Sequence, residues 1–271
     1  RYKFLGQIIA AVILIVVGIT PNLHRVVEPL GIPLAVNPEA FSVEWLFQRG
    51  IAALIAVFFV LGATNSLNLL DGLDGLCAGV TAIITVAMLL LSIHLATWGY
   101  SKSGDPARMV ICLGLVGGVC GFLPFNRHPA KIFMGDAGSM LLEYTAAALM
   151  LLFAEGVPRW WMASIVVFGL PILDTGVALV RRFLNKRPLF VSDRGHIYDQ
   201  MIDRGIALNK TVAICYGLAG AYAIVGLVMS QMRTWFAAGV YLAVLIVSAL
   251  VVWGKGYLRM EGIRGAVRKS D

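Results

Sequence analysis

Residues 50–76 read GIAALIAVFFVLGATNSLNLLDGLDGL. The apolar run over residues 50–68 is long enough to cross the roughly 30 Å hydrocarbon core of a membrane as a helix. Two carboxylates, Asp71 and Asp74, follow directly after its end. Carboxylates at the edge of a membrane span are costly to desolvate, so they usually have a function. The stretch therefore predicts a membrane helix with a polar site at one end.

The composition extends this reading to the whole chain. Hydrophobic residues make up 59% of it and charged residues 14%, and the mean hydropathy is +0.83. These values lie far from those of soluble globular domains. We therefore expect a polytopic membrane protein whose partners include the membrane itself and exclude nucleic acid.

Eight apolar runs have the length of a membrane span, and each run is continuous rather than alternating. A transmembrane barrel would need short strands of alternating polarity. We predict an all-α polytopic helical bundle, formed as a single domain over residues 1–271. The expected spans are approximately 4–20, 50–68, 76–99, 107–125, 138–155, 159–180, 211–230 and 234–254.

The distribution of Lys and Arg predicts the orientation of this bundle. Eight spans place both termini and the loops near 69–75, 126–137 and 181–210 on one side. That side carries 16 of the 22 Lys and Arg residues. Because positive charge is enriched in cytoplasmic loops, we expect these loops, and an active-site cleft between them, to face the cytoplasm. The net charge of +7 is thus first a topology signal and only second a hint of anionic ligands.

The acidic residues gather on this predicted cytoplasmic side. Asp71 and Asp74 follow the second span, Asp136 follows the fourth, and Asp174 lies near the end of the sixth. Mg²⁺ prefers oxygen ligands, usually one or two carboxylates completed by water and substrate phosphates. A single Asp is better explained as a turn or cap residue. Several aspartates gathered on one face of the bundle favour a Mg²⁺ site.

Spacing strengthens that interpretation at the end of the second span. Asp71 and Asp74 are three residues apart, and Asn65 and Asn68 continue the same interval backwards. On a helical turn these four side chains would form one stripe. We therefore expect a shared helical face that suits a hard cation and a polar ligand.

Two further loops carry residues suited to phosphate. Residues 135–139, GDAGS, combine glycines that admit a phosphate with the start of a helix. The neighbouring segment 126–131, NRHPAK, adds an amide, two cations and an imidazole. In the loop over 181–210, Arg194 and His196 lie well away from the membrane boundary. A solvated basic loop remains the alternative for each.

Four motifs in consistent order resemble the polyprenyl-phosphate N-acetylhexosamine-1-phosphate transferases. They read NSLNLLDGLDGL, FLPFNRHPAKIFMGDAGSMLLEY, PILDTGVALVRRF and SDRGHIYDQMIDRG. The resemblance implies transfer of a sugar-1-phosphate from a UDP-amino sugar, with UDP-GlcNAc favoured, to undecaprenyl or another polyprenyl phosphate. UMP is released, as a first membrane step of cell-wall or surface polysaccharide synthesis. It also implies a bacterial inner membrane location and Mg²⁺ as cofactor.

The same resemblance implies roles for individual residues. Mg²⁺ would be bound by Asp136 and Asp71, and the nucleotide sugar would be held by further polar side chains on the same face. The implied catalytic set is Asp71, Asp74 and Asp136, and the implied substrate-binding set is Asn68, Asn126, Arg194 and His196.

Other interpretations stay open at this point. One is a phospho-N-acetylmuramoyl-pentapeptide transferase type of reaction. Another is a secondary transporter, for which Glu143 is the only acid well inside a span; a carboxylate near a cytoplasmic helix start explains it equally. An aspartate pair of the family would precede residue 1, so we expect an N-terminally short chain, with an inactive fragment as a third alternative. A homodimer is also left open.

Overall fold

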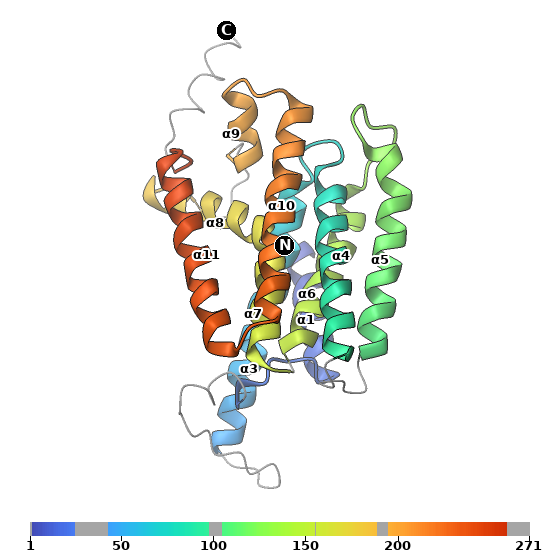
Figure 1. The fold of residues 1–271 in the computed structure, drawn as a ribbon, viewed down its shortest axis with the longest axis vertical. Coiled ribbons are helices and arrows are strands. Elements are labelled where there is room, and N and C mark those ends of the chain that lie inside the picture. Colours follow the sequence, from blue (N-terminus) through green and yellow to red (C-terminus); the bar gives the residue numbers. More distant parts are fainter. Residues whose placement is uncertain (1, 25–42, 98–104, 155, 189–194, 259–271) are drawn as a thin grey trace.

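The protein is an all-α bundle, as expected from the sequence. The computed structural model describes residues 2–24, 43–97, 105–154, 156–188 and 195–258, and these residues contain no strand. The helices are α1 Tyr2–Val16, α3 Val43–Leu70, α4 Leu76–Thr97, α5 Asp105–Asn126, α6 Gly135–Ala154, α7 Pro158–Val167, α8 Gly169–Leu184, α9 Ile197–Asp203, α10 Leu208–Ser230 and α11 Thr234–Gly254 (Figure 1).

Six of these helices, α3, α4, α5, α6, α10 and α11, are long and apolar enough to span a membrane. The expected count of eight spans is not confirmed. The first predicted span is the shorter helix α1, of 15 residues. The span predicted over 159–180 consists of α7 and α8, which meet at an angle of 69°. The pair gives a seventh span if it is counted as one.

The break between α7 and α8 follows from the local sequence. Pro171 lies in the first turn of α8 and has no N–H to donate to the carbonyl of Val167, the last residue of α7. A continuous hydrogen-bond ladder cannot run through such a position, so the helix kinks. Figure 1 shows the result: α8 lies across the long axis that α10 and α11 follow.

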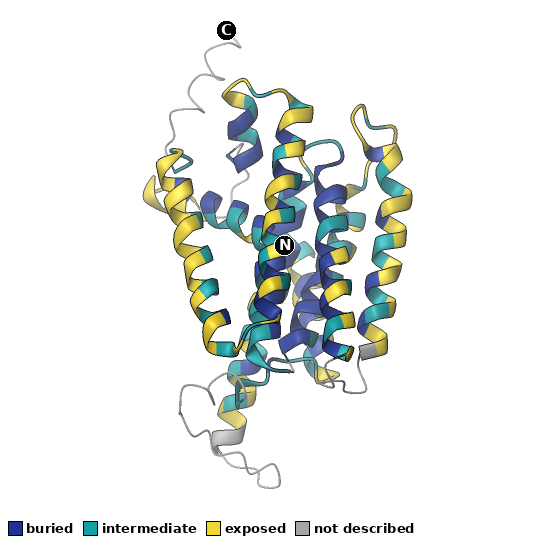
Figure 2. Cartoon of the chain, in the orientation of Figure 1, coloured by how far each residue is buried: buried dark blue, intermediate teal, exposed yellow. Residues whose placement is uncertain are grey.

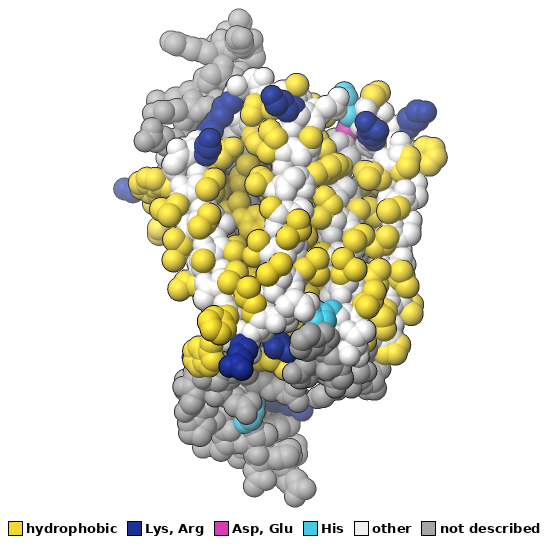
Figure 3. All heavy atoms as spheres, in the orientation of Figure 1, with side chains coloured by type: hydrophobic (Ala, Val, Ile, Leu, Met, Phe, Trp, Pro, Cys, Tyr) yellow, Lys and Arg dark blue, Asp and Glu magenta, His cyan; other side chains and the backbone are white. Residues whose placement is uncertain are grey.

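Helix α4 lies near the centre of the bundle, packed against α5 and α10, while α3 packs against α6 and α1. Figure 2 shows α4 and the inner side of α10 mainly buried, whereas the outer sides of α5 and α11 are exposed. Large buried side chains, among them Trp160, Phe153 and Phe168, fill the interior. Figure 3 shows the outer surface as an apolar band with Lys and Arg gathered at its two ends, the pattern of a protein that sits in lipid.

Candidate active site

Asn68, in the last turn of α3, joins three helices at the expected site. The Lys3 ammonium of α1 donates to Asn68 Oδ1 over 2.6 Å. Asn68 Nδ2 in turn donates to Ser139 Oγ at 2.9 Å and to Asp136 Oδ1 at 3.4 Å, both on the first turns of α6. The structure thus brings the two motifs that contain Asn68 and Asp136, 68 residues apart, to one point.

Asp71 completes this group of polar side chains. Burial, together with the nearby Asp136 carboxylate, raises the pKa of Asp71 to about 6. A carboxylate in this state favours a neutralising partner, either a proton or a cation.

The donor set fits Mg²⁺ as that ion is usually bound. In the part of the chain that the structure describes, no three or more His, Cys, Asp or Glu side chains form a complete metal cage. Mg²⁺ does not require one, because it commonly takes one or two carboxylates and fills its other positions with water and substrate phosphates. Asp71 and the exposed Asp136 would supply the two carboxylates.

The expected helical stripe is wrong in one respect. Helix α3 ends at Leu70, so Asp71 and Asp74 lie in the following turn rather than on one helical face. Asp74 instead contacts the loop after α5: His128 Nδ1 lies 2.8 Å from its Oδ2, and the Ala130 N–H donates to the same oxygen over 3.1 Å. The hydrogen bond from His128 and that from Ala130 lower the pKa of Asp74. The surroundings therefore raise the pKa of Asp71 and lower the pKa of Asp74.

Asn126 supports the turn between α3 and α4. Its Oδ1 accepts the Gly75 N–H over 3.1 Å, and its Nδ2 donates to the Ile132 carbonyl over 3.0 Å. Gly75 has φ +77°, a conformation that residues with a Cβ rarely adopt. The substrate-binding role predicted for Asn126 stays a prediction, because in this structure its side chain is buried and fastens the backbone that carries Asp71 and Asp74.

Two tyrosines hold the same turn from outside, and the sequence reasoning placed neither of them there. The Tyr198 hydroxyl of α9 donates to the Leu69 carbonyl over 2.6 Å, and the Tyr216 hydroxyl of α10 donates to the Gly75 carbonyl over 2.6 Å. The space that a Cβ at Gly72 would need is taken by Tyr198. The closely spaced glycines of this motif could have indicated such a neighbour, because a glycine lets a large side chain pack directly against the backbone.

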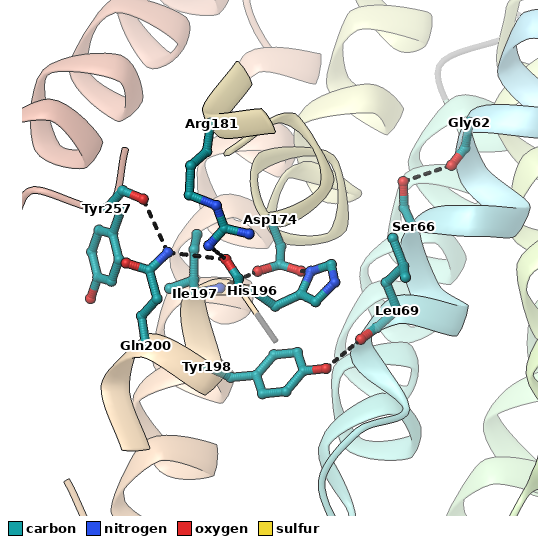
Figure 4. Close-up of polar contacts among 11 residues, drawn as sticks. Gly62, Ser66, Leu69, Asp174, Arg181, His196, Ile197, Tyr198, Gln200 and Tyr257 are labelled. Carbon is teal, nitrogen blue, oxygen red and sulfur yellow. Dashed lines mark hydrogen bonds and ion pairs between the residues drawn. The ribbon is translucent and has the colours of Figure 1, made fainter. Parts of the chain in front are cut away.

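His196 lies at the N-terminus of α9 and is buried against α8. Its Nδ1 lies 2.7 Å from Asp174 Oδ2, and the Ile197 N–H donates to Asp174 Oδ1 over 2.6 Å (Figure 4). Tyr198 connects this pair to the end of α3. Arg194, the other residue expected here, lies outside the described residues.

Glu143 is buried inside α6. The sequence allowed either an acid inside a span or a carboxylate near a cytoplasmic helix start; in the structure Glu143 is 0% exposed, and neither oxygen has a hydrogen-bond partner within the described ranges. Residues 136, 139 and 143 recur at helical intervals, so they share one side of α6. This periodicity could have indicated that Glu143 points inward with Asp136 and Ser139.

The chain is similar to several bacterial transferases. It is 30% identical over 262 residues to a "Probable undecaprenyl-phosphate N-acetylglucosaminyl 1-phosphate transferase" of Bacillus subtilis (strain 168), covering 90% of this chain and 70% of that protein. It is 34% identical over 208 residues to a "Phospho-N-acetylmuramoyl-pentapeptide-transferase" of Geobacillus thermodenitrificans (strain NG80-2), covering 73% and 56%. It is 32% identical over 240 residues to a "Decaprenyl-phosphate N-acetylglucosaminephosphotransferase" of Mycobacterium tuberculosis (strain ATCC 25618 / H37Rv), covering 82% and 55%.

The chain thus spans 70% of the first of these relatives and little more than half of the other two. The sequence profile described as "Glycosyl transferase family 4" matches residues 1–154, which is more than half of the chain. That segment contains Asn68, Asp71 and Asp136, the residues that the structure gathers at the end of α3. This membrane-spanning helical chain therefore belongs to glycosyl transferase family 4.

Proposed function

We propose that the protein transfers an amino-sugar 1-phosphate, GlcNAc-1-phosphate in the first instance, from its UDP derivative to a polyprenyl phosphate and releases UMP. The single observation that carries this proposal is the pairing of two carboxylates at the end of a membrane helix: Asp136 accepts a hydrogen bond from Asn68 and lies close enough to Asp71 to raise the pKa of that residue. Two of the similar relatives are named as N-acetylglucosamine phosphotransferases of undecaprenyl and decaprenyl phosphate, which supports the same donor and acceptor.

The proposed chemistry is attack by a phosphate oxygen of the lipid on the sugar-bearing phosphorus of the donor. The new P–O bond forms as the bond to UMP breaks. When bound, Mg²⁺ would neutralise charge on the diphosphate. Asp71 and Asp136 would hold that ion, and Asn68 orients Asp136. An attacking phosphate is already anionic, so positioning is the main task of the protein.

The start of α6 provides a suitable place for a donor phosphate. The helix begins at Gly135, where no atom would lie within 4 Å of a Cβ, so the approach to its first N–H groups is open. Free N–H groups at a helix N-terminus favour anions. Ser139 and Asp136 lie on the same first turns. This arrangement supports a diphosphate bound between α6 and the turn after α3.

An apolar cavity of about 470 Å³ between α7, α8, α10 and α11 suits the lipid acceptor. One side of α8, with Gly169, Ile172 and Gly176, lines this cavity. Asp174, on the same helix, is not among the residues that line the cavity and contacts His196 instead (Figure 4). Helix α8 therefore stands between an apolar space and the polar network, which supports a lipid chain on one side and a phosphate on the other. We further propose that the polar face is cytoplasmic and the membrane a bacterial inner membrane.

The test is UMP release from the purified protein in detergent with undecaprenyl phosphate and Mg²⁺. UDP-GlcNAc and UDP-MurNAc-pentapeptide are compared as donors, because one similar relative is named for the second reaction. Asp136→Asn keeps the size of the side chain but removes its charge, and we expect turnover to fall about 100-fold or more, as for loss of a key electrostatic group. Asp203→Asn, an exposed change on α9, serves as the control.

UMP release that Asp136→Asn leaves unchanged at saturating Mg²⁺ would remove Asp136 from the site. Consumption of the pentapeptide donor alone would replace GlcNAc as the transferred sugar. Release from neither donor by the wild-type protein would overturn the proposal.

A further inference from the structure

Asp174 is buried in α8, and its two carboxylate oxygens have separate partners. The side chain is 1% exposed. Oδ1 accepts the backbone N–H of Ile197 over 2.6 Å, and Oδ2 lies 2.7 Å from His196 Nδ1. Because a carboxylate only accepts hydrogen bonds, the His196 ring must carry its proton on Nδ1. Asp174 thus fixes both the start of α9 and the protonation of one ring nitrogen.

Tyr198 links the His196 ring to the turn that carries Asp71. It stacks on Tyr198 with ring centroids 5.6 Å apart and an interplanar angle of 11°. Tyr198 in turn bonds to the Leu69 carbonyl and fills the space beside Gly72. Figure 4 shows the ring on the side of Asp174 that faces Leu69 and Ser66 of α3. The hydrogen bond of the ring within the described residues is made by Nδ1, and Nε2 is left for a ligand.

The backbone before His196 is held from two other directions. The Arg181 guanidinium donates to the Gly195 carbonyl and occupies the space that a side chain at 195 would need. Gln200 Nε2 donates to the same carbonyl over 3.0 Å and to the Tyr257 carbonyl, after α11, over 3.0 Å. The start of α9 is therefore fastened to α8 and to the end of α11. These contacts hold the backbone at the start of α9, and the contact between Nδ1 and Asp174 holds the ring.

We propose that Asp174 is a positioning residue that holds His196 so that Nε2 is presented to an anionic phosphate oxygen of the nucleotide-sugar donor. The inference rests on the proposed function, which brings a diphosphate to the turn containing Asp71. An imidazole whose Nδ1–H bonds to a carboxylate can carry a second proton on Nε2, and the carboxylate balances the resulting charge. Nε2–H then donates a charge-assisted hydrogen bond to the phosphate. No covalent bond forms or breaks at His196.

Asp174→Asn tests this arrangement with little change of shape. The backbone N–H of Ile197 needs an acceptor, so the new amide oxygen takes the place of Oδ1 and the amide NH₂ faces His196 Nδ1. Nδ1 must then accept, and the ring proton moves to Nε2. A second proton on the ring would have to sit on Nδ1, where that N–H and the amide NH₂ of the new asparagine would face each other as two donors, so it is disfavoured. The variant therefore retains the contacts of α9 but leaves a neutral ring in the opposite tautomer.

The experiment measures UDP-GlcNAc affinity in the presence of Mg²⁺ by calorimetry, the kcat/KM of UMP release, and the tautomer of His196 by ¹⁵N NMR on histidine-labelled protein. We expect Asp174→Asn to reverse the tautomer and to weaken both UDP-GlcNAc affinity and kcat/KM by roughly 10- to 100-fold, as for partners that orient a ligating His. Asp203→Asn, at an exposed position of α9, should change none of the three.

A double-mutant cycle separates positioning from general stability. In a His196→Gln background, Asp174→Asn should cause no further loss of UDP-GlcNAc affinity, because its effect passes through the ring. An equal loss in both backgrounds would overturn the proposal, as would a reversed tautomer with affinity and kcat/KM unchanged. If the wild type binds UDP-GlcNAc without turning it over, the proposed function fails while the affinity cycle still tests Asp174. If it binds no UDP-GlcNAc, both proposals fail.

Discussion

The raised pKa of Asp71 would make the proposed Mg²⁺ binding sensitive to pH in a range where an ordinary aspartate does not titrate. Burial is the larger cause of its pKa of about 6, and the Asp136 carboxylate adds to it. Because the pKa is raised, the proton stays bound to higher pH, and the carboxylate form that would bind Mg²⁺ is lost as pH falls through 6 rather than through 4.

The size of the effect follows from proton competition at this one group. With a pKa of about 6, about nine in ten Asp71 side chains are protonated at pH 5 and about one in thirty at pH 7.5. The apparent Kd for Mg²⁺ should therefore rise about tenfold between pH 7.5 and pH 5, which corresponds to about 1.4 kcal/mol. An aspartate at its usual pKa would give almost no change over this interval.

Calorimetric titration of the purified protein with Mg²⁺ at half-unit steps of pH measures this directly. Asp71→Asn should weaken binding at pH 7.5 and remove the dependence below pH 7. Asp203→Asn should leave the curve in place, because that side chain is exposed and distant in sequence from the site. A midpoint near pH 4, or a pH dependence that Asp71→Asn retains, would refute the assignment of Asp71 as a metal ligand with a raised pKa.

Two further substitutions test the packing around the site. A Cβ at Gly79 would overlap the Tyr216 ring, whose hydroxyl bonds to the Gly75 carbonyl. Gly79→Ala should therefore lower the unfolding free energy by about 1–3 kcal/mol and reduce the melting temperature in detergent. Gly114→Ala is the matched control, because no atom lies within 4 Å of its Cβ, and an equal loss there would contradict the overlap. Glu143→Gln should raise the melting temperature, because a fully buried carboxylate without a hydrogen-bond partner in the described residues is more costly to bury than a neutral amide. UMP release should persist in this variant. A lower melting temperature would indicate that the charge of Glu143 is compensated in the wild type.

The class of the protein and its helices could be predicted from the sequence because the length and continuity of an apolar run are local properties. Each of the eight predicted spans contains a helix in the structure, and the motifs that contain Asn68 and Asp136 meet through a hydrogen bond. The residue types of the motifs were enough to predict this meeting, because carboxylates and amides at the ends of membrane spans are costly to bury in lipid and therefore tend to gather in a shared polar site.

Other features depend on contacts between distant parts of the chain. The partner of Asp74 is His128, 54 residues away, and the Lys3–Asn68 contact joins residues 65 apart. Whether Asp71 and Asp74 share a helical face depended on where α3 ends, which local spacing did not reveal.

The sequence by itself determined a polytopic helical membrane protein and the residue types of its polar site, because hydropathy and residue chemistry are written along the chain. Only the tertiary structure showed three features: α8 meets α7 at 69°, the Tyr198 and Tyr216 hydroxyls bond to the backbone at the two ends of the turn that carries Asp71 and Asp74, and Asp174 contacts the His196 ring. The physical reason is that the direction and protonation of a side chain depend on which neighbours share its buried space, and packing alone selects those neighbours.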